Sequence, residues 1–283
     1  MKIGCSLYSY RKTLGSHEFN LEDSTLWQEY QNQGIEGVEL WVPPIEKLNW
    51  DEVEPMRKLQ STLADYNISI LGFCVESGFM ATSVLPHHVP YEEWLESAKR
   101  ANMERGDYAR FWLDIAGEVG VPNMRFCFGP GFYGYTVTAS EVVPFNVERA
   151  VELYEPLCQE AQDVGVRIGY ENHGFITSDL AFAEAVLDRV PNLNVCLDVG
   201  NLPENRWPYI EAIASRGRVL YVHAKTYAFD ENGEDTWTDF GKAMGILQNA
   251  GFDGWYSVEW EGSGLTDSEG VNKTVALLNK WKY

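Results

Sequence analysis

The sequence predicts a single (β/α)8 barrel, the TIM-barrel fold, as one domain over residues 1–283. Two observations support this α/β class. Eight short apolar segments of strand character alternate with eight amphipathic segments of helical spacing, which indicates parallel strands joined by right-handed crossovers. No linker rich in Pro or Ser and no shift in composition divides the chain. A doubly wound open sheet is the alternative, but such sheets usually have fewer strands, so eight units favour a closed barrel.

A recurring junction marks four of the strands: a helical segment ends at a glycine, and a short apolar segment follows. A glycine in this place can close a helix in the left-handed conformation without steric cost. We therefore expect positive φ at the four junction glycines, which are Gly34, Gly120, Gly165 and Gly251.

The remaining elements follow from apolar content and spacing. Strands without a junction glycine are predicted at residues 2–9, 68–73, 195–198 and 219–223. Amphipathic spacing predicts helices at 25–33, 53–66, 109–119, 147–164, 180–189, 209–216, 240–250 and 268–281. Segments 76–92 and 227–239, after the third and seventh strands, are predicted to be long loops. Loops at the carboxyl ends of barrel strands build the active site, so we expect these two to cover a pocket.

The charge of the chain excludes several classes of partner. Its 22 Lys and Arg against 42 Asp and Glu give a formal net charge of −20, which argues against nucleic acid and against an anionic membrane surface. No apolar run approaches the roughly 18 residues that span a membrane. The five cysteines lack any C-x-x-C spacing, and most lie in apolar segments, which indicates reduced thiols. We expect a cytoplasmic protein, and a homo-oligomer is compatible with the sequence.

Four successive predicted strands each end in a potential metal ligand. Glu171 closes the fifth strand, and the next three end in Asp198, His223 and Glu259. A charge after an apolar run is costly unless it points into a polar mouth or is paired there. One such acid is usually a solvated or salt-bridged group, but four in succession at one end of a barrel indicate a site. Three carboxylates and one imidazole suit Mn²⁺ or Mg²⁺, with Co²⁺ and Zn²⁺ as alternatives.

With these residues in place, the sequence resembles the xylose isomerase-like TIM barrels, a superfamily often called sugar phosphate isomerases/epimerases. The resemblance covers nearly the whole chain and is carried by the segments 170–174 (YENHG), 197–201 (LDVGN), 222–225 (VHAK) and 251–261 (GFDGWYSVEWE). It implies that the four strand-end residues bind one divalent metal ion. It also implies that Glu171 and Glu259 act as acid/base groups on either side of a ketose or aldose.

These roles predict a metal-dependent isomerase or epimerase with a small sugar, keto-sugar or cyclitol as its partner. Removing a proton next to a carbonyl builds an enediolate, whose charge a cation stabilises. Return of the proton to the opposite face gives epimerisation, and return to the neighbouring carbon gives aldose–ketose isomerisation. A metal-dependent dehydratase or lyase uses the same base and metal and is the main alternative. A non-catalytic sugar-binding protein is a further one, against which the intact ligand set argues.

Three positions depart from the pattern of ketohexose epimerases. Those enzymes place a Glu, a His and an Arg where this chain has Thr177, Asn201 and Phe229. The residues that grip the substrate therefore differ, and inososes, hydroxypyruvate and 3-keto-glycosides are candidate substrates.

Five further residues are predicted to bind substrate. His173 and Lys225 each lie two positions beyond a predicted ligand and so face the same way; the alternatives are orienting a ligand for His173 and pairing with Glu261 for Lys225. Glu39 ends the second strand. Arg206, like Arg125, is a candidate anion clamp. Trp260 belongs to a set of aromatic residues suited to line a sugar site, which also includes Trp41, Phe79, Trp207, Tyr227 and Trp237.

Overall fold

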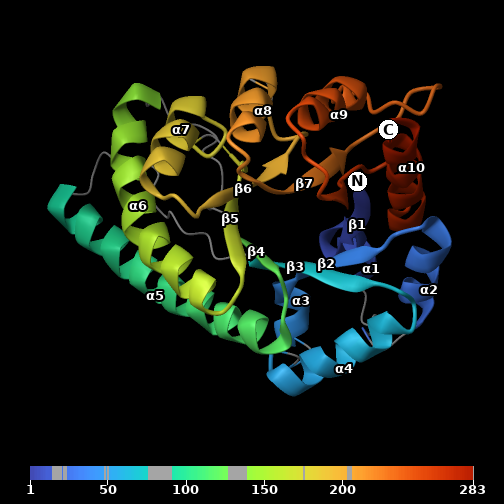
Figure 1. Ribbon diagram of the computed structural model, residues 1–283, viewed down its shortest axis with the longest axis horizontal. Coiled ribbons are helices and arrows are strands. Elements are labelled where there is room, and N and C mark those ends of the chain that lie inside the picture. Colours follow the sequence, from blue (N-terminus) through green and yellow to red (C-terminus); the bar gives the residue numbers. More distant parts are fainter. Residues whose placement is uncertain are drawn as a thin grey trace.

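The protein, seen here as a computed structural model, is a closed barrel of eight parallel strands surrounded by helices (Figure 1). The strands follow one another around the ring in sequence order, and β8 pairs with β1 to close it. The structure describes residues 1–14, 21, 24–47, 49, 51–75, 91–126, 139–174, 176–202 and 206–282. The predicted (β/α)8 fold is confirmed.

All eight strands lie where the sequence places them, with shifts of a few residues at their ends. They are β1 (Lys2–Ser6), β2 (Gly37–Trp41), β3 (Ser69–Val75), β4 (Asn123–Phe126), β5 (Arg167–Glu171), β6 (Asn194–Asp198), β7 (Val219–Thr226) and β8 (Trp255–Trp260). The first strand ends at Ser6 rather than at residue 9, because the Ser6 side chain accepts from the Tyr8 N–H and starts the 3-10 helix η1 (Leu7–Tyr10). The seventh strand continues to Thr226, which brings Lys225 into the barrel wall.

The helices surround the strands as a crossover layer (Figure 1). They are α1 (Arg11–Leu14), α2 (Ser24–Gln33), α3 (Val42–Lys47), α4 (Val53–Ala64), α5 (Tyr91–Val119), α6 (Ala139–Asp163), α7 (Leu180–Arg189), α8 (Arg206–Ser215), α9 (Phe240–Asn249) and α10 (Asp267–Lys280). The short helices α1 and α3 have no counterpart among the predicted elements.

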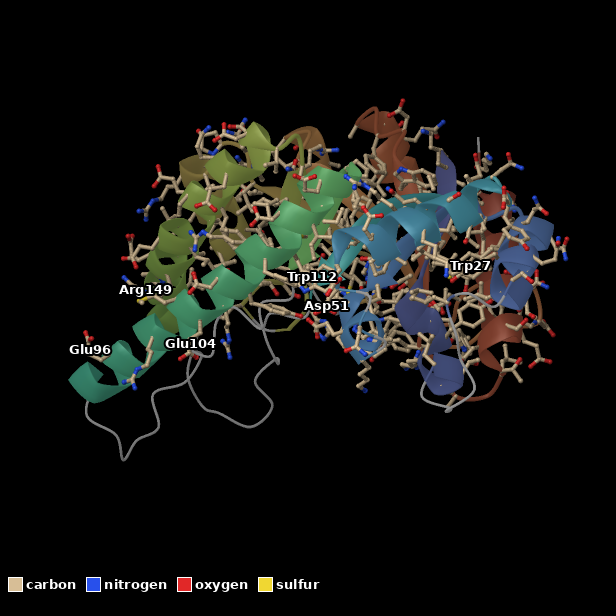
Figure 2. The ribbon with its side chains drawn as sticks, turned by 90° about the horizontal axis from the view of Figure 1, so that it is seen from below. Trp27, Asp51, Glu96, Glu104, Trp112 and Arg149 are labelled. Carbon is tan, nitrogen blue, oxygen red and sulfur yellow. The ribbon has the colours of Figure 1, made fainter. Side chains whose placement is uncertain are left out.

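The predicted helices at 109–119 and 147–164 are only the carboxyl-terminal parts of α5 and α6. The 29-residue α5 runs past the barrel, with Glu96 near its projecting end (Figure 2). Residues 91 and 92, predicted to be loop, are its first turn. In α6 the missed turns lie around Pro144, which the helix contains. A proline lacks the N–H that a helix interior uses, so its presence obscures where the helix begins.

The junction glycines have the predicted conformation. Their φ values are +75° at Gly34, +73° at Gly120, +76° at Gly165 and +79° at Gly251. The prediction that β7 lacks such a residue was wrong, because Gly217 precedes it with φ +64°. Asn67, with φ +58°, closes the helix before β3 in the same way.

The apolar core has two parts. The larger part lies between the strands and the helices and includes Trp27 and Trp112, both fully buried. A smaller cluster of Leu71, Cys196, Leu220 and Tyr221 is packed against Trp255. The free thiols Cys5, Cys74, Cys158 and Cys196 are all buried, as the sequence suggests, and Cys127 lies outside the described residues. Among the described helices, none combines the length and apolarity that a membrane crossing requires.

Candidate metal centre

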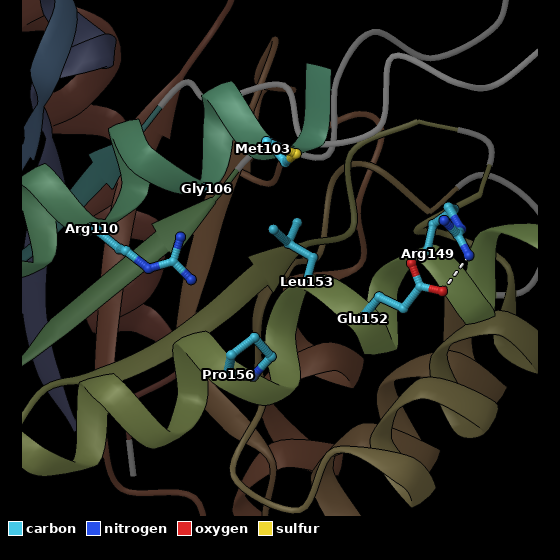
Figure 3. Close-up of a pocket in the computed structure, with 7 residues that line it drawn as sticks. All are labelled: Met103, Gly106, Arg110, Arg149, Glu152, Leu153 and Pro156. Carbon is cyan, nitrogen blue, oxygen red and sulfur yellow. Dashed lines mark hydrogen bonds and ion pairs between the residues drawn. The ribbon is translucent and has the colours of Figure 1, made fainter. Parts of the chain in front are cut away.

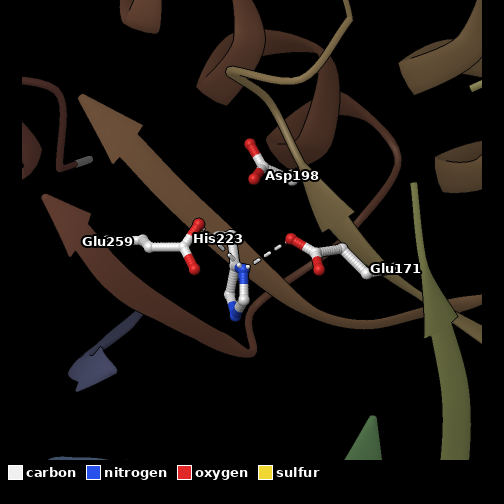
Figure 4. A group of neighbouring side chains, drawn as sticks. All are labelled: Glu171, Asp198, His223 and Glu259. Carbon is white, nitrogen blue, oxygen red and sulfur yellow. Dashed lines mark hydrogen bonds and ion pairs between the residues drawn. The ribbon is translucent and has the colours of Figure 1, made fainter. Parts of the chain in front are cut away.

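Three carboxylate side chains and one imidazole meet at the carboxyl ends of β5, β6, β7 and β8 (Figure 4). Glu171, Asp198, His223 and Glu259 each offer one ligand atom, and these atoms all lie within 4.8 Å of one another. An ion held at about 2.1 Å separates its ligands by roughly 3 to 4 Å, so small side-chain movements would close this group around one ion. The sequence predicted this grouping, and the structure brings all four residues together in a buried position.

Strand register sets the facing of these residues. Asp198 pairs with His223, and Lys225 pairs with Glu259, in the parallel ladders of β6, β7 and β8. Because alternate residues of a strand face the same side, His223 and Lys225 point into the barrel together. Lys225 therefore enters the same buried group.

The two ring nitrogens of His223 face different carboxylates. Nδ1 lies 3.1 Å from Glu171 Oε1 and 3.4 Å from Glu259 Oε2. Nε2 lies 2.8 Å from Glu39 Oε2. A metal-binding histidine commonly donates its second ring N–H to a carboxylate, which fixes the ring and its tautomer.

Glu39 is fully buried and is held by several donors. The Tyr221 hydroxyl donates to its Oε1 at 2.7 Å, and the Ser257 hydroxyl donates to its Oε2 at 3.3 Å. The structure thus places Glu39 against His223, on the side of the ring away from the other ligands. Its predicted contact with substrate stays a prediction.

A buried arginine pairs with the first of the four residues. Arg125 Nη1 lies 2.8 Å from Glu171 Oε2, and its Nε lies 3.5 Å from Glu39 Oε1. Arg125 is the last residue but one of β4 and is only 2% exposed. The sequence suggested an anion clamp at this position; in the structure its anions are two carboxylates of the protein.

A buried lysine pairs with the last of the four. Lys225 Nζ lies 3.0 Å from Asp198 Oδ2 and 3.0 Å from Glu259 Oε2. It also donates to Asn201 Oδ1 at 3.2 Å and lies 3.4 Å from Glu261, whose side chain is partly exposed. Pairing with Glu261, one of the two roles expected for Lys225, is present.

The buried charges of the described residues around the centre do not cancel. Four carboxylates, Glu39, Glu171, Asp198 and Glu259, stand against Arg125 and Lys225. With a neutral imidazole, two negative charges are left over. One divalent cation carries the charge that would neutralise this group, so the donor set and its charge both fit such an ion.

The close approach of charged groups shifts the pKa values of these carboxyl groups in different directions. Burial raises the pKa of Asp198 to about 7, and the negative charges of Glu259 and Glu171 add to this effect against the attraction of Lys225. Burial also raises the pKa values of Glu171 and Glu259, but nearby positively charged groups lower them by more. Both pKa values therefore lie below the usual value for glutamate. Arg125 and the two histidines act on Glu171. Lys225 and His223 act on Glu259.

The other predicted substrate-binding residues occupy different places. His173 is partly exposed, with Nδ1 3.5 Å from Glu171 Oε2, so it lies at the mouth beside the centre. Arg206 donates to two backbone carbonyls, those of Leu202 and Trp237, at 2.8 Å each. The roles of both in substrate binding stay predictions.

Trp260 is buried away from water. It is 1% exposed, stacks on Phe229 at a centroid distance of 5.8 Å and lies against Gly270 of α10, where any added Cβ would meet its ring. Its predicted contact with a sugar is untested by this packing. Phe79, another of the predicted aromatic residues, lies outside the described residues.

A separate hollow lies between α5 and α6, on the outer layer (Figure 3). Its lining includes Met103, Gly106, Arg110 and Arg149. None of its lining residues belongs to the four-residue group, so this hollow is distinct from the candidate metal centre.

A family comparison agrees with the barrel fold. The family model described as "Xylose isomerase-like TIM barrel" matches residues 27–281. The chain belongs to the xylose isomerase-like TIM barrel family. The resemblance seen in the sequence is thereby confirmed.

Individual relatives of this xylose isomerase-like barrel are distant over the full chain. The IolI protein, solved with a bound zinc atom, is 15% identical with a TM-score of 0.71, covering 100% of this chain and 99% of its own. The 3-keto-D-glucoside 4-epimerase YcjR of E. coli is 15% identical with a TM-score of 0.70, covering 99% of each chain. A segment of 44 residues is 46% identical to the 3'-dehydrocarminate deglycosidase alpha subunit of Microbacterium sp., but this spans only 16% of this chain and 13% of that relative's length.

Proposed function

We propose that this protein is a divalent-metal-dependent isomerase or epimerase that acts on a sugar, keto-sugar or cyclitol. The observation that carries this proposal is the placement of two glutamates about one centre. Glu171 from β5 and Glu259 from β8 approach it from different sides, and Asp198 and His223 lie between them (Figure 4).

The proposed metal ligands are Glu171, Asp198, His223 and Glu259. Three carboxylates favour a hard ion, so we propose Mn²⁺ or Mg²⁺, with Co²⁺ and Zn²⁺ as alternatives. The zinc atom bound by the structurally similar IolI protein supports a divalent metal ion as the cofactor. When bound, the ion would supply a fixed positive charge beside the substrate oxygens, which stabilises negative charge that develops there.

The two glutamates are suited to move protons. Their lowered pKa values keep both in the carboxylate form, which accepts a proton. Arg125 holds Oε2 of Glu171, and Lys225 holds Oε2 of Glu259, so each base has a fixed orientation. One glutamate, as a carboxylate, removes the proton next to the carbonyl. The other delivers a proton that it has first taken up from solvent to the opposite face, or the first returns its own proton to the neighbouring carbon.

A lyase is the second candidate, and the local match to the deglycosidase subunit favours it. In that reaction the same base removes the proton next to the carbonyl, and the substituent on the following carbon leaves with its bonding electron pair. The 3-keto-glucoside epimerase among the structural relatives supports a keto-sugar as the shared substrate class.

The deciding experiment is a screen in D₂O. Metal-loaded protein is incubated with ketoses, inososes and 3-keto-glycosides, and deuterium at the carbon next to the carbonyl is followed by NMR. We expect exchange with at least one class, together with an epimer or isomer; an eliminated product would instead establish the lyase. Binding without exchange would indicate a sugar-binding protein. His223→Ala is the matched control and should lose both bound metal and exchange.

A further inference from the structure

Trp237 is a large apolar side chain exposed at the carboxyl-terminal end of the barrel. It is 53% exposed and lies in the segment that connects β7 to α9. The other exposed large apolar residues of the described chain are Met103, Phe111 and Val164, which lie in or just after the outer helices α5 and α6. Trp237 is therefore exposed on the face where the candidate metal centre opens.

The ring of Trp237 is held in one place. Its Nε1–H donates to the carbonyl of Gly200 at 2.8 Å, and its backbone carbonyl accepts from Arg206 Nη1 at 2.8 Å. The Arg206 guanidinium also lies over the ring, 5.7 Å from the centroid. A side chain that is exposed only by chance would not be expected to have three such restraints.

Buried Asp235 fixes the segment itself. Its carboxylate accepts backbone N–H groups of Tyr227, Trp237 and Thr238 at 2.7 to 3.0 Å. Asp235 is 7% exposed, and the pairing of Phe229 with it closes a small antiparallel bridge. The exposed indole is thus carried by a segment that several hydrogen bonds hold in place.

Gly200 connects this indole to the metal centre. The Gly200 N–H donates to Asp198 Oδ1 at 2.7 Å. A Cβ at Gly200 would lie 2.9 Å from Cβ of Lys225, so the backbone here is in direct contact with both charged side chains. Trp237 is one hydrogen bond away from that backbone, immediately outside the buried charged group.

We infer that Trp237 is a stacking platform for a second ring of the substrate, so that the preferred substrate is a glycoside of the reacting keto-sugar rather than a free monosaccharide. This rests on the proposed function, which puts the reacting sugar at the metal centre. A fixed, half-exposed indole face binds the apolar face of a flat ring, whether the CH face of a second sugar or an aromatic group. Arg206 is then a positioning residue that holds the indole.

Three 3-keto-β-D-glucosides test this inference: the methyl glucoside, the phenyl glucoside and a 3-keto-disaccharide. Their binding to metal-loaded protein is measured by saturation-transfer NMR and titration, and deuterium exchange gives KM and kcat. We expect the phenyl probe, the disaccharide or both to bind about 3- to 10-fold more tightly than the methyl probe, as an aromatic contact would give. The probe that binds more tightly shows whether the second ring of the substrate is an aromatic group or a sugar.

The variants decide whether Trp237 causes the difference. Trp237→Ala should lower the affinity for the phenyl glucoside and the disaccharide to the affinity for the methyl glucoside. Trp237→Phe should keep most of this gap in affinity between the two-ring probes and the methyl probe. Phe111→Ala, which removes an exposed aromatic ring from α5, should leave the gap unchanged. Equal binding of all three probes by the unchanged protein, or a gap that survives Trp237→Ala, would overturn the inference. If no probe exchanges deuterium but the gap in binding is present, the proposed function fails while the platform stands.

Discussion

Glu39 holds His223 from across the barrel, with 2.8 Å between Glu39 Oε2 and His223 Nε2. The two residues belong to β2 and β7, which are not neighbours in the ring, so this contact crosses the interior. With its proton on Nε2 the imidazole donates to Glu39, and the lone pair of Nδ1 faces Glu171 and Glu259. This is the tautomer that a metal ion at the centre would require.

Loss of the Glu39 carboxylate should therefore weaken metal binding without removing a ligand. We expect Glu39→Ala to reduce the affinity for Mn²⁺ by about 10- to 100-fold, because the ring loses its orientation and tautomer. Glu39→Gln, whose amide oxygen can still accept from Nε2, should have a smaller effect. Competition with a metal-sensitive dye measures both. Glu36→Gln changes an exposed carboxylate just before the same strand and serves as the control. Unchanged affinity in folded Glu39→Ala would separate Glu39 from the metal.

Lys225 should contribute most to the stability of the protein when no metal is bound. Its side chain is 2% exposed and neutralises Asp198 and Glu259, so Lys225→Met leaves two buried carboxylates without their cation. Breaking a buried pair typically costs about 3–5 kcal/mol, which corresponds to a fall in Tm on the order of 10 °C for the metal-free protein.

A bound divalent ion supplies part of the missing charge. The gap in Tm between metal-loaded and metal-free protein should therefore be wider in Lys225→Met than in the unchanged protein, as calorimetry would show. Lys282→Met removes an exposed lysine and should leave the gap as it was. An equal gap in Lys225→Met would mean that metal and lysine do not act on the same carboxylates.

The sequence predicts the ligand set because strand ends are visible in it. In a parallel barrel the carboxyl ends of all strands meet at one face, so an acid after each apolar run is already placed. The same logic found the junction glycines, whose left-handed conformation depends only on local chain geometry. The predicted helix at 109–119 is shorter than α5. Residues 91–108 precede the strongly apolar stretch on which that prediction was based.

Side-chain contacts between strands could not be predicted from the sequence. That Glu39 meets His223 across the barrel, and that Arg125 meets Glu171 on the neighbouring strand, depends on the stagger between strands, which no local pattern encodes. Both residues lie within predicted strands, which was the one signal of their position. The structure places Glu39 in the middle of β2, which continues to Trp41, rather than at the end of that strand. The burial of Trp260 follows from strand alternation: Glu259 faces the barrel interior, so the next residue faces α10.

Metal affinity should fall as the pH is lowered through about 7. Burial raises the pKa of Asp198 to about 7 in the metal-free protein, so below that value the carboxyl holds a proton that the ion must displace. Burial lowers the pKa of His223, but the negative charges of Glu39 and Glu259 raise it by more, and its proton acts in the same direction. We expect at least a tenfold loss of affinity per pH unit below about 7, with proton release on binding. Calorimetric titration in buffers of different ionisation enthalpy measures both, and an affinity that is constant from about pH 8 to about pH 6 would contradict the expectation.

The last prediction concerns which carboxylates move protons. Glu171 and Glu259 lie three strand positions apart around the eight-stranded ring, so they reach a central substrate from different sides. Replacement of either by Gln keeps the size and one oxygen ligand but removes the proton acceptor. Each variant should keep weakened metal binding and lose turnover by at least about a hundredfold, the usual scale for a lost general base. If two opposed bases epimerise the substrate, one variant should still exchange solvent deuterium into one epimer without inverting it, because the remaining glutamate can remove and return the proton on its own face. Asp239→Asn, which changes the carboxylate that caps α9, is the matched control and should retain turnover. Near-normal turnover in both Gln variants would show that neither glutamate is the base and that the two-base mechanism is wrong.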